Sequence, residues 1–219
     1  MQDKIFLKEG DRWFERNLQS LRKTDDIVIF LIDLYNLYPS KVFELGSSNG
    51  YRLARIKEKF DCYVIGVEPS HKACFDGRKN FSLEMISGVG SEIPIKDNVF
   101  DLVIVNSVFH WIDRQNLLKT VSELDRILKD GGFIIIGDFF PDYLYLKVRY
   151  HHLSDKHVFT YKQDYSKIFT FSGIYKKIAT LTYDVSDKKL KTSIGRDYKF
   201  SVTLMQKNLN DYLEVELKK

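Results

Sequence analysis

Cysteine, proline and long apolar runs are scarce in this sequence. Of its 219 residues, 2 are cysteine and 4 are proline, which excludes a disulfide framework and a multi-cysteine zinc site. We expect Cys62 and Cys74 to be ordinary reduced thiols. No stretch approaches the about 18 apolar residues that a membrane-spanning helix needs, and the first residues lack the pattern of a secretory signal. These absences predict a cytoplasmic protein that does not bind a membrane.

A strong excess of one charge is also absent. Lys plus Arg number 34 and Asp plus Glu number 30, which leaves a formal charge of +4. So mild an excess does not by itself indicate a nucleic-acid-binding protein, for which a concentrated basic stripe is typical. The 44% of hydrophobic and 29% of charged residues are typical of a globular chain. We expect no nucleic acid partner and a protein that is a monomer or a homodimer.

Hydrophobic spacing predicts an α/β fold. Two helical stretches at 10–21 and 25–38 come first. Strands are then expected at 41–45, 63–68, 83–87, 100–106 and 133–136, alternating with helices at 50–59, 70–79 and 115–128. A helix at 163–171 and two alternating strands at 175–183 and 198–206 follow. Near-continuous apolar strands predict a mostly parallel sheet with helices on both faces, and the last two strands predict an antiparallel hairpin.

No linker or composition break separates two domains, so residues 1–219 are expected to form a single domain. Its expected segments are N-terminal helices at 1–39, a core at 40–140, an insert with a helix at 141–175 and the terminal hairpin at 176–207. The first part of the insert is rich in Tyr and His and has little apolar periodicity, so we assign it no strand.

The most informative motif is the turn Glu44-Leu-Gly-Ser-Ser-Asn-Gly50, which leaves an apolar strand and enters a helix. Gly46 and Gly50 allow a tight turn and a close approach of the backbone to a ligand. The Gly-x-Ser-x-Gly spacing differs from the dinucleotide fingerprint Gly-x-Gly-x-x-Gly, which disfavours a nicotinamide-dependent oxidoreductase. Because Glu44 would repel a diphosphate and attract an ammonium group, the motif favours a cationic ligand with an amino group.

A carboxylate follows at the end of the second strand. The run Gly66-Val-Glu68-Pro69 places Glu68 where its side chain can accept hydrogen bonds from both hydroxyls of a ribose. The glycine turn and this carboxylate together are more specific than either motif alone.

These motifs resemble those of the class I S-adenosylmethionine-dependent methyltransferases, and the resemblance covers about residues 40–140. Two further runs match in the family's order, Ile93-Pro-Ile-Lys-Asp-Asn-Val-Phe-Asp101 and Leu128-Lys-Asp-Gly-Gly-Phe133. The resemblance implies a Rossmann-like, seven-stranded and mostly parallel sheet with an antiparallel last strand. It also implies S-adenosylmethionine as the cofactor.

The resemblance further implies which residues hold this cofactor. The expected set is Glu44, Gly46, Ser47, Ser48 and Gly50 around the methionine part, Glu68 and Pro69 at the ribose, and Asn106. Many family members carry an aspartate after the third strand for the adenine amino group, where this chain has Val89. Adenine would then be held by backbone groups and apolar contact, or Val89 would only fill the core.

Histidines are the candidate catalytic residues beside the acceptor, which the resemblance places at the run Asn106-Ser-Val-Phe-His-Trp111. An imidazole suits proton transfer at neutral pH, so His110 is a candidate base; a substrate contact and a structural cap of the strand are the alternatives. His151 and His152 in the insert are further candidates. With His157 they suggest a metal site, but the segment lacks the regular elements and carboxylates of catalytic zinc sites, so no metal is expected.

Aromatic and basic residues are the candidates for substrate binding. They are Trp13, Arg16, Trp111, Arg149 and Tyr150. Trp13 and Arg16 would belong to an N-terminal helical lid or to a plain amphipathic helix, and Arg149 could pair with a carboxylate or phosphate. By contrast, Arg52, Arg55, Lys57 and Lys59 are expected on a solvated face.

We therefore expect an S-adenosylmethionine-dependent methyltransferase that methylates oxygen or nitrogen of a small polar metabolite. Trp13-Phe-Glu-Arg-Asn17 and Tyr161-Lys-Gln-Asp-Tyr165 show a looser resemblance to methylases of bacterial nonulosonate and surface-glycan biosynthesis, which points to a sugar or nucleotide sugar. A nucleic-acid methyltransferase and a binding or partner protein of the same fold without catalysis are the alternatives.

Overall fold

Alternating buried side chains place the central strands between two hydrophobic cores. In β1 (Lys41–Leu45), Val42 packs into one core and Phe43 into the other; in β4 (Phe100–Asn106), Leu102 and Val103 divide in the same way. Because successive side chains of a strand point to opposite faces, both faces of the sheet are covered. The structure, a computed structural model, describes residues 2–21, 26–143, 145–153, 158–187, 189–191, 194 and 199–210.

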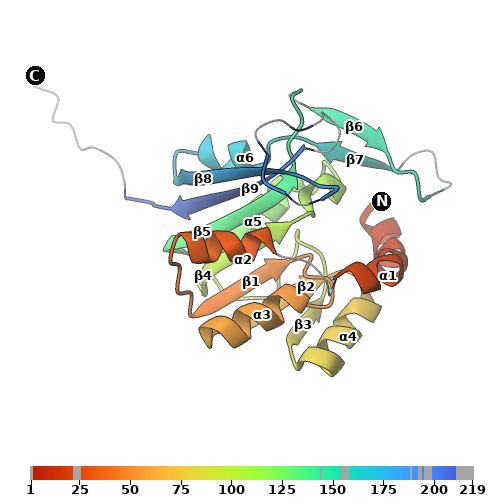
Figure 1. The fold of residues 1–219 in the computed structure, drawn as a ribbon, viewed down its shortest axis with the longest axis horizontal. Coiled ribbons are helices and arrows are strands. Elements are labelled where there is room, and N and C mark those ends of the chain that lie inside the picture. Colours follow the sequence, from red (N-terminus) through yellow and green to blue (C-terminus); the bar gives the residue numbers. More distant parts are fainter. Residues whose placement is uncertain are drawn as a thin grey trace, which may run out of the picture.

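The main sheet has seven strands in the order β3-β2-β1-β4-β5-β9-β8 (Figure 1). The remaining strands are β2 (Tyr63–Glu68), β3 (Glu84–Ser87), β5 (Leu128–Phe139), β8 (Tyr175–Asp184) and β9 (Lys199–Lys207). Strands β1 to β5 run parallel, and β9 lies antiparallel between β5 and β8. This arrangement confirms the predicted seven-stranded Rossmann-like sheet with an antiparallel last strand.

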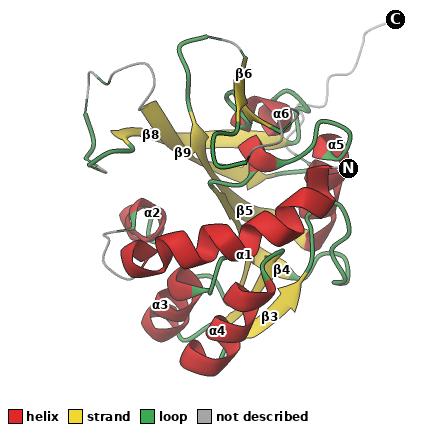
Figure 2. Ribbon diagram, turned by 90° about the vertical axis from the view of Figure 1, so that its right-hand side faces the viewer, coloured by secondary structure: helices red, strands yellow, loops and turns green. Residues whose placement is uncertain are grey.

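Helices cover the two faces of the sheet and the end at which the parallel strands finish. One core contains residues of α2 (Ile27–Leu34), α3 (Tyr51–Phe60) and α4 (His71–Phe81), and the other contains residues of α5 (Leu117–Ile127) and α6 (Ser166–Thr170). The long helix α1 (Gln2–Leu21) crosses in front of the edge where the parallel strands end (Figure 2). None of the helices in the described ranges is long and apolar enough to cross a bilayer.

The insert holds a hairpin that the hydrophobic spacing does not predict. Strands β6 (Leu146–Arg149) and β7 (Phe159–Lys162) form a separate antiparallel sheet at the same end of the molecule as α1 (Figure 1). The side chains of β6 are mostly exposed, so no apolar alternation marks this strand in the sequence. Strand β7 packs beside the short 3-10 helix η1 (Phe109–Trp111) that follows β4.

Some element boundaries also differ from the expected ones. Helix α1 begins well before residue 10, and α2 ends at Leu34 rather than at residue 38. Strand β5 begins directly after α5 rather than at residue 133, so residues 130–132 lie within the strand, next to a register shift between Phe100 and Leu102. These shifts leave the order of the elements unchanged.

Candidate functional site

Three cavities meet at the carboxyl ends of the parallel strands, and Gly46 lines all three. Cavity A, of about 150 Å³, is lined by Glu9, Trp13, Gly46, Glu68, Trp111 and Tyr150, among others. Cavity B, of about 80 Å³, is lined by Gly46, Val89, Gly90, Asn116 and Thr120. Cavity C, of about 430 Å³, is lined by Glu44, Gly46, Ser47, Tyr51 and Arg52. A larger hollow of about 740 Å³ lies beside α2 and α3 and includes neither Gly46 nor Glu68.

The topology of the sheet explains why a cleft lies here. Strand β1 has β2 on one side and β4 on the other, so the connections leaving these strands diverge and open a crevice beyond their carboxyl ends. Gly46 follows β1, Glu68 ends β2, Val89 follows β3 and Asn106 ends β4. The structure therefore brings these four predicted cofactor-binding residues to one crevice, whereas Gly50, at the start of α3, lines none of the three cavities.

Gly46 adopts a backbone conformation that suits glycine and is tightly enclosed. Its φ is +67°, and a Cβ at this position would lie 2.3 Å from Cγ2 of Val108. Two other residues of the cleft, Ser48 (φ +52°) and Ser107 (φ +63°), are held in the same left-handed region. Such strain in non-glycine residues is concentrated at functional sites of proteins.

Glu68 is buried and organises the glycine turn. Its Oε2 accepts a hydrogen bond from the backbone N–H of Ser48, and its Oε1 accepts one from that of Ser70, both at 2.9 Å. Burial raises the pKa of Glu68 to about 7, although the two backbone hydrogen bonds oppose the rise. Each carboxylate oxygen keeps a further lone pair, so the side chain can still accept hydrogen bonds from two ligand hydroxyls.

We expect the affinity for S-adenosylhomocysteine to rise about tenfold between pH 6 and pH 8, because only the ionised Glu68 accepts two hydroxyl hydrogen bonds and its ionised fraction grows through pH 7. In Glu68→Gln the affinity should fall by about 10- to 100-fold at pH 8, and the rise should shrink to what Glu44, whose pKa is also about 7, contributes. Isothermal titration at both pH values measures the effect. In the control Glu44→Gln the rise should persist and move to lower pH, because Glu44 helps to raise the Glu68 pKa. A Glu68→Gln variant whose rise is as large as that of the wild type would contradict the assignment.

A group of buried polar atoms without partners surrounds the cleft. Seven buried side-chain nitrogen or oxygen atoms of the described residues have no hydrogen-bond partner, and five of them belong to residues that line cavity A or C. These five are Glu9 Oε2, Glu44 Oε2, Ser47 Oγ, Ser48 Oγ and Asn106 Oδ1. Because buried polar groups in proteins are almost always hydrogen-bonded, this concentration indicates a polar ligand.

A buried arginine lines cavity C, which corrects one prediction. Arg52 does not lie on a solvated face: its Nε donates to Asp26 Oδ2 at 2.8 Å and its Nη1 donates to Glu44 Oε1, with both carboxylates buried. Burial raises the pKa of Glu44 to about 7, while Arg52 opposes the rise. Asp26 also caps α2 by accepting hydrogen bonds from Val28 and Ile29. Arg52 thus connects α3, the start of α2 and the predicted cofactor residue Glu44.

Helix α1 and the insert close cavity A together. Glu9 Oε1 accepts hydrogen bonds from Nη2 of Arg16 at 2.5 Å and from the hydroxyl of Tyr150 at 2.8 Å. Tyr150 in turn stacks edge-on against Trp111, with ring centroids 4.5 Å apart. Trp13, Arg16, Trp111 and Tyr150 were predicted from the sequence and are brought together here, whereas Glu9 was not. The only sequence signal for Glu9 is its position one helical turn before Trp13.

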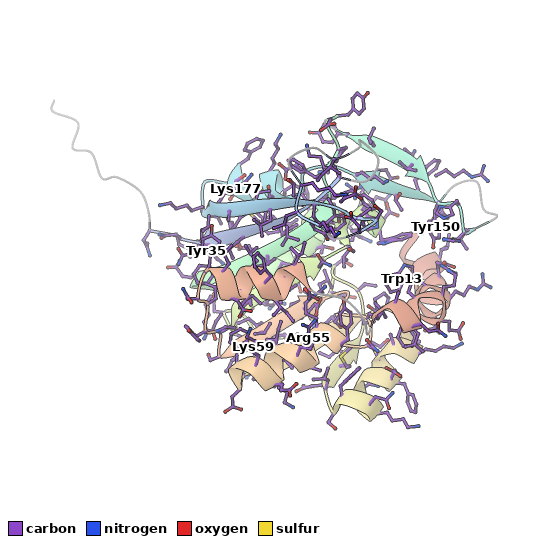
Figure 3. The ribbon with its side chains drawn as sticks, viewed as in Figure 1. Trp13, Tyr35, Arg55, Lys59, Tyr150 and Lys177 are labelled. Carbon is purple, nitrogen blue, oxygen red and sulfur yellow. The ribbon has the colours of Figure 1, made fainter. Side chains whose placement is uncertain are left out.

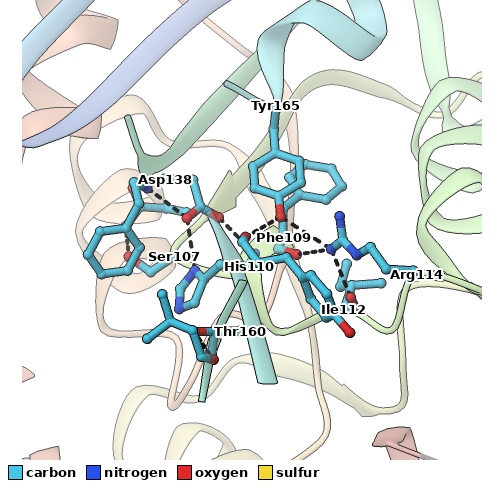
Figure 4. Close-up of polar contacts among 12 residues, drawn as sticks. Ser107, Phe109, His110, Ile112, Arg114, Asp138, Thr160 and Tyr165 are labelled. Atoms are coloured by element: carbon cyan, nitrogen blue, oxygen red, sulfur yellow. Dashed lines mark hydrogen bonds and ion pairs between the residues drawn. The ribbon is translucent and has the colours of Figure 1, made fainter. Parts of the chain in front are cut away.

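His110 lies beneath the cleft rather than in it. Its Nδ1 lies 2.9 Å from Asp138 Oδ1, and its backbone N–H donates to Asp138 Oδ2 at 3.1 Å (Figure 4). The side chain of His110 is 7% exposed and does not line cavity A, which its neighbour Trp111 does. This geometry ties η1 to β5 and positions Trp111, so it favours the structural alternative for His110; a catalytic role stays a prediction.

The segment Tyr161 to Tyr165 also has a structural setting. The guanidinium of Arg114 lies 4.3 Å from the ring centre of Tyr161 and donates to the Tyr165 hydroxyl at 3.2 Å (Figure 4). Tyr165 is buried and stacks on Phe109 of η1. The segment Tyr161 to Tyr165, which suggested a glycan methylase, therefore packs against η1 and supports it.

The remaining predicted residues of the insert lie at the surface. Arg149, His151 and His152 are exposed, and none of them lines cavity A, B or C. The two histidine rings lie 4.0 Å apart, and the described part of the chain holds no group of three metal-ligating side chains around them. His157 lies outside the described residues.

The strand order is that of the Rossmann-like methyltransferase fold, and the glycine turn after β1 and the buried carboxylate at the end of β2 lie where the resemblance to S-adenosylmethionine-dependent methyltransferases predicts them. Sequence comparison agrees with this fold over part of the chain. Residues 43–136, which contain both motifs, match the family described as a methyltransferase domain.

Curated relatives match part of the chain at low identity. A malonyl-[acyl-carrier protein] O-methyltransferase of Nitrosospira multiformis is 25% identical over 193 residues, which cover 74% of this chain and 62% of the relative. One from Coxiella burnetii is 28% identical over 120 residues, which cover 54% and 40%. A tRNA U34 carboxymethyltransferase of Desulfotalea psychrophila is 28% identical over 125 residues, covering 49% and 38%. The chain thus spans about half the length of the curated relatives it matches.

Solved structures share the fold over most of the chain. The 1,6-didemethyltoxoflavin-N1-methyltransferase of Burkholderia thailandensis, solved with 1,6-didemethyltoxoflavin and S-adenosylhomocysteine, has a TM-score of 0.71 and 13% identity; the match covers 94% of this chain and 87% of that one. The N-methyltransferase NodS of Bradyrhizobium japonicum, solved with S-adenosylhomocysteine, has a TM-score of 0.57 and 12% identity, covering 88% and 86%.

Proposed function

We propose that this protein transfers a methyl group from S-adenosylmethionine to a small polar metabolite that contains a ring, such as a sugar or the sugar of a nucleotide sugar. One observation carries the proposal: cavity A connects Gly46 and Glu68 with an aromatic wall of Trp13, Trp111 and Tyr150. Its volume of about 150 Å³ suits a group of the size of one ring. A single space therefore borders both the predicted cofactor residues and the predicted substrate residues.

The residues present fit the proposed cofactor. Glu68 would accept the ribose hydroxyls, and cavity B, with Val89 at its side and no acidic residue in its lining, suits a flat adenine held by backbone and apolar contacts. Glu44 Oε2, Ser47 Oγ and Ser48 Oγ offer partners for the amino and carboxylate groups of the methionine part, because each is buried without one.

S-adenosylmethionine supplies a methyl group that its sulfonium already activates for in-line displacement. What this chain has to do is align an acceptor and exclude water, which contributes several kcal/mol to such a transfer. The enclosure of cavity A by α1 and Tyr150 serves both requirements. An acceptor hydroxyl would also need a proton acceptor, and Glu9 is a carboxylate in the lining of that cavity.

Two assays test the proposal separately. Isothermal titration should show S-adenosylhomocysteine binding to the purified protein. Incubation with methyl-labelled S-adenosylmethionine and a fractionated bacterial extract should label the small-molecule fraction. Label in the tRNA fraction or on acyl carrier protein would replace the proposed acceptor class, and binding without any transfer would favour the non-catalytic alternative.

A further inference from the structure

A buried carboxylate oxygen in cavity A has no hydrogen-bond partner among the residues that the structure describes. Glu9 is 3% exposed, and its Oε1 is held by Arg16 and Tyr150 while its Oε2 has no hydrogen-bond partner. Leaving an acceptor buried and unpaired costs about 1–3 kcal/mol, and more for a charged group. A group that enters the cavity and donates a hydrogen bond to Oε2 would remove this cost.

The charges around Glu9 restrict what that group can be. A carboxylate only accepts hydrogen bonds, so its partner must carry an N–H or O–H. Arg16 already offsets the negative charge of Glu9 through its ion pair, so the partner does not need a positive charge. An anionic group would meet the lone pairs of Oε2 and of the nearby Glu68, and would be repelled.

The walls of cavity A add a shape requirement. Trp13 on α1 and Tyr150, which follows β6, both line cavity A and lie at the same end of the molecule (Figure 3). Trp111 contacts Tyr150 edge-on at an interplanar angle of 83°. Aromatic walls favour a flat apolar face, and the single carboxylate oxygen favours one polar edge.

We propose that Glu9 determines acceptor specificity by receiving a hydrogen bond from a neutral ring that carries an N–H or O–H group, and that it selects against carboxylate acceptors. This inference rests on the proposed function, because the acceptor must enter cavity A for transfer. It narrows that function to acceptors that carry a hydrogen-bond donor on a ring, and it assigns the recognition of this donor to Glu9 of α1.

The two tryptophans of the chain, Trp13 and Trp111, both line cavity A, so intrinsic fluorescence reports on this cavity. The protein is first saturated with S-adenosylhomocysteine and then titrated with three probes. Pyrazole is a flat ring with an N–H, 1-methylpyrazole lacks the N–H, and acetate is an anion. Pyrazole should bind about 10- to 100-fold more tightly than 1-methylpyrazole, as a hydrogen bond to a charged group predicts, and acetate should not quench.

Two variants separate recognition of the probe by Glu9 from the closure of cavity A by Tyr150. In Glu9→Gln the preference for pyrazole over 1-methylpyrazole should fall to about one or reverse, because the amide can present a donor instead. In Tyr150→Phe, which loses one hydrogen bond to Oε1 and leaves Oε2 unchanged, the preference should persist even if both probes bind more weakly.

Three results would overturn the inference: equal binding of the two pyrazoles to the wild type, an unchanged preference in Glu9→Gln, or a tenfold loss of S-adenosylhomocysteine affinity in Glu9→Gln, which would place the carboxylate against the cofactor. A wild-type protein that does not bind S-adenosylhomocysteine would instead contradict the proposed function. The two failures are therefore distinguishable.

Discussion

Replacing Gly46 by alanine should weaken S-adenosylhomocysteine binding by at least about 100-fold, because Gly46 lines all three cavities and has no room for a side chain. The new Cβ would lie 2.3 Å from Val108 Cγ2, so the turn or η1 must move. The positive φ of +67° adds strain for any residue with a Cβ. Isothermal titration measures the loss, and circular dichroism shows whether the variant is folded.

The matched control is Gly131→Ala. Gly131 has a φ of +74°, close to that of Gly46, but a Cβ there has no atom within 4 Å. The two variants therefore share backbone strain, and only Gly46→Ala fills the cleft. Adding Val108→Ala to Gly46→Ala should recover part of the binding, because it removes the contacting methyl groups. If Gly46→Ala binds S-adenosylhomocysteine as tightly as Gly131→Ala does, the cleft does not lie where we place it.

Replacing Arg52 by methionine should lower the free energy of unfolding by about 3–5 kcal/mol, the range expected when one partner of a buried ion pair is removed. The substitution keeps much of the side-chain volume but leaves Glu44 and Asp26 buried without their common cation. Urea unfolding followed by circular dichroism measures the loss. The exposed Arg55→Ala, on the same helix, is the control and should change stability by less than about 1 kcal/mol.

The loss in Arg52→Met should depend on pH. Arg52 lowers the pKa of Glu44, which burial raises to about 7, so the variant should raise it further. A carboxyl whose folded-state pKa exceeds its unfolded one stabilises the fold at low pH and loses that contribution as pH rises through the folded pKa. The variant should therefore lose more stability at pH 8 than at pH 5. A loss that is equal at both pH values would assign the effect to packing instead of charge.

Local patterns in the sequence were sufficient to predict the main sheet. The apolar strands around Val42 and Val103 alternate between two cores, and this period-two burial is visible in the sequence as near-continuous hydrophobic runs. The glycine turn and Glu68 were predictable because each lies at the end of such a strand. The carboxyl ends of parallel strands lie at one end of the sheet, so a sequence that predicts the strands also predicts where the cleft lies.

The parts that could not be predicted depend on contacts between distant segments. Arg52 follows the pattern of an exposed helix, and only the fold shows that Asp26 and Glu44 enclose it. Glu9 and Tyr150 are separated by 141 positions, so their hydrogen bond has no local signature. The side chains of β6 are mostly exposed and give this strand no apolar face, so hydrophobic periodicity does not reveal the β6–β7 hairpin.

The antiparallel strand β9 has a consequence for synthesis of the chain. It lies between β5 and β8 in space but follows both in sequence, so neither β5 nor β8 can complete its ladder on this side of the sheet until β9 has left the ribosome. Until then the apolar edge of β5 around Ile134–Ile136 stays open to other nascent chains. We expect slow codons or a translational pause between residues 184 and 199 to increase co-translational aggregation, even though the finished sheet shields that edge.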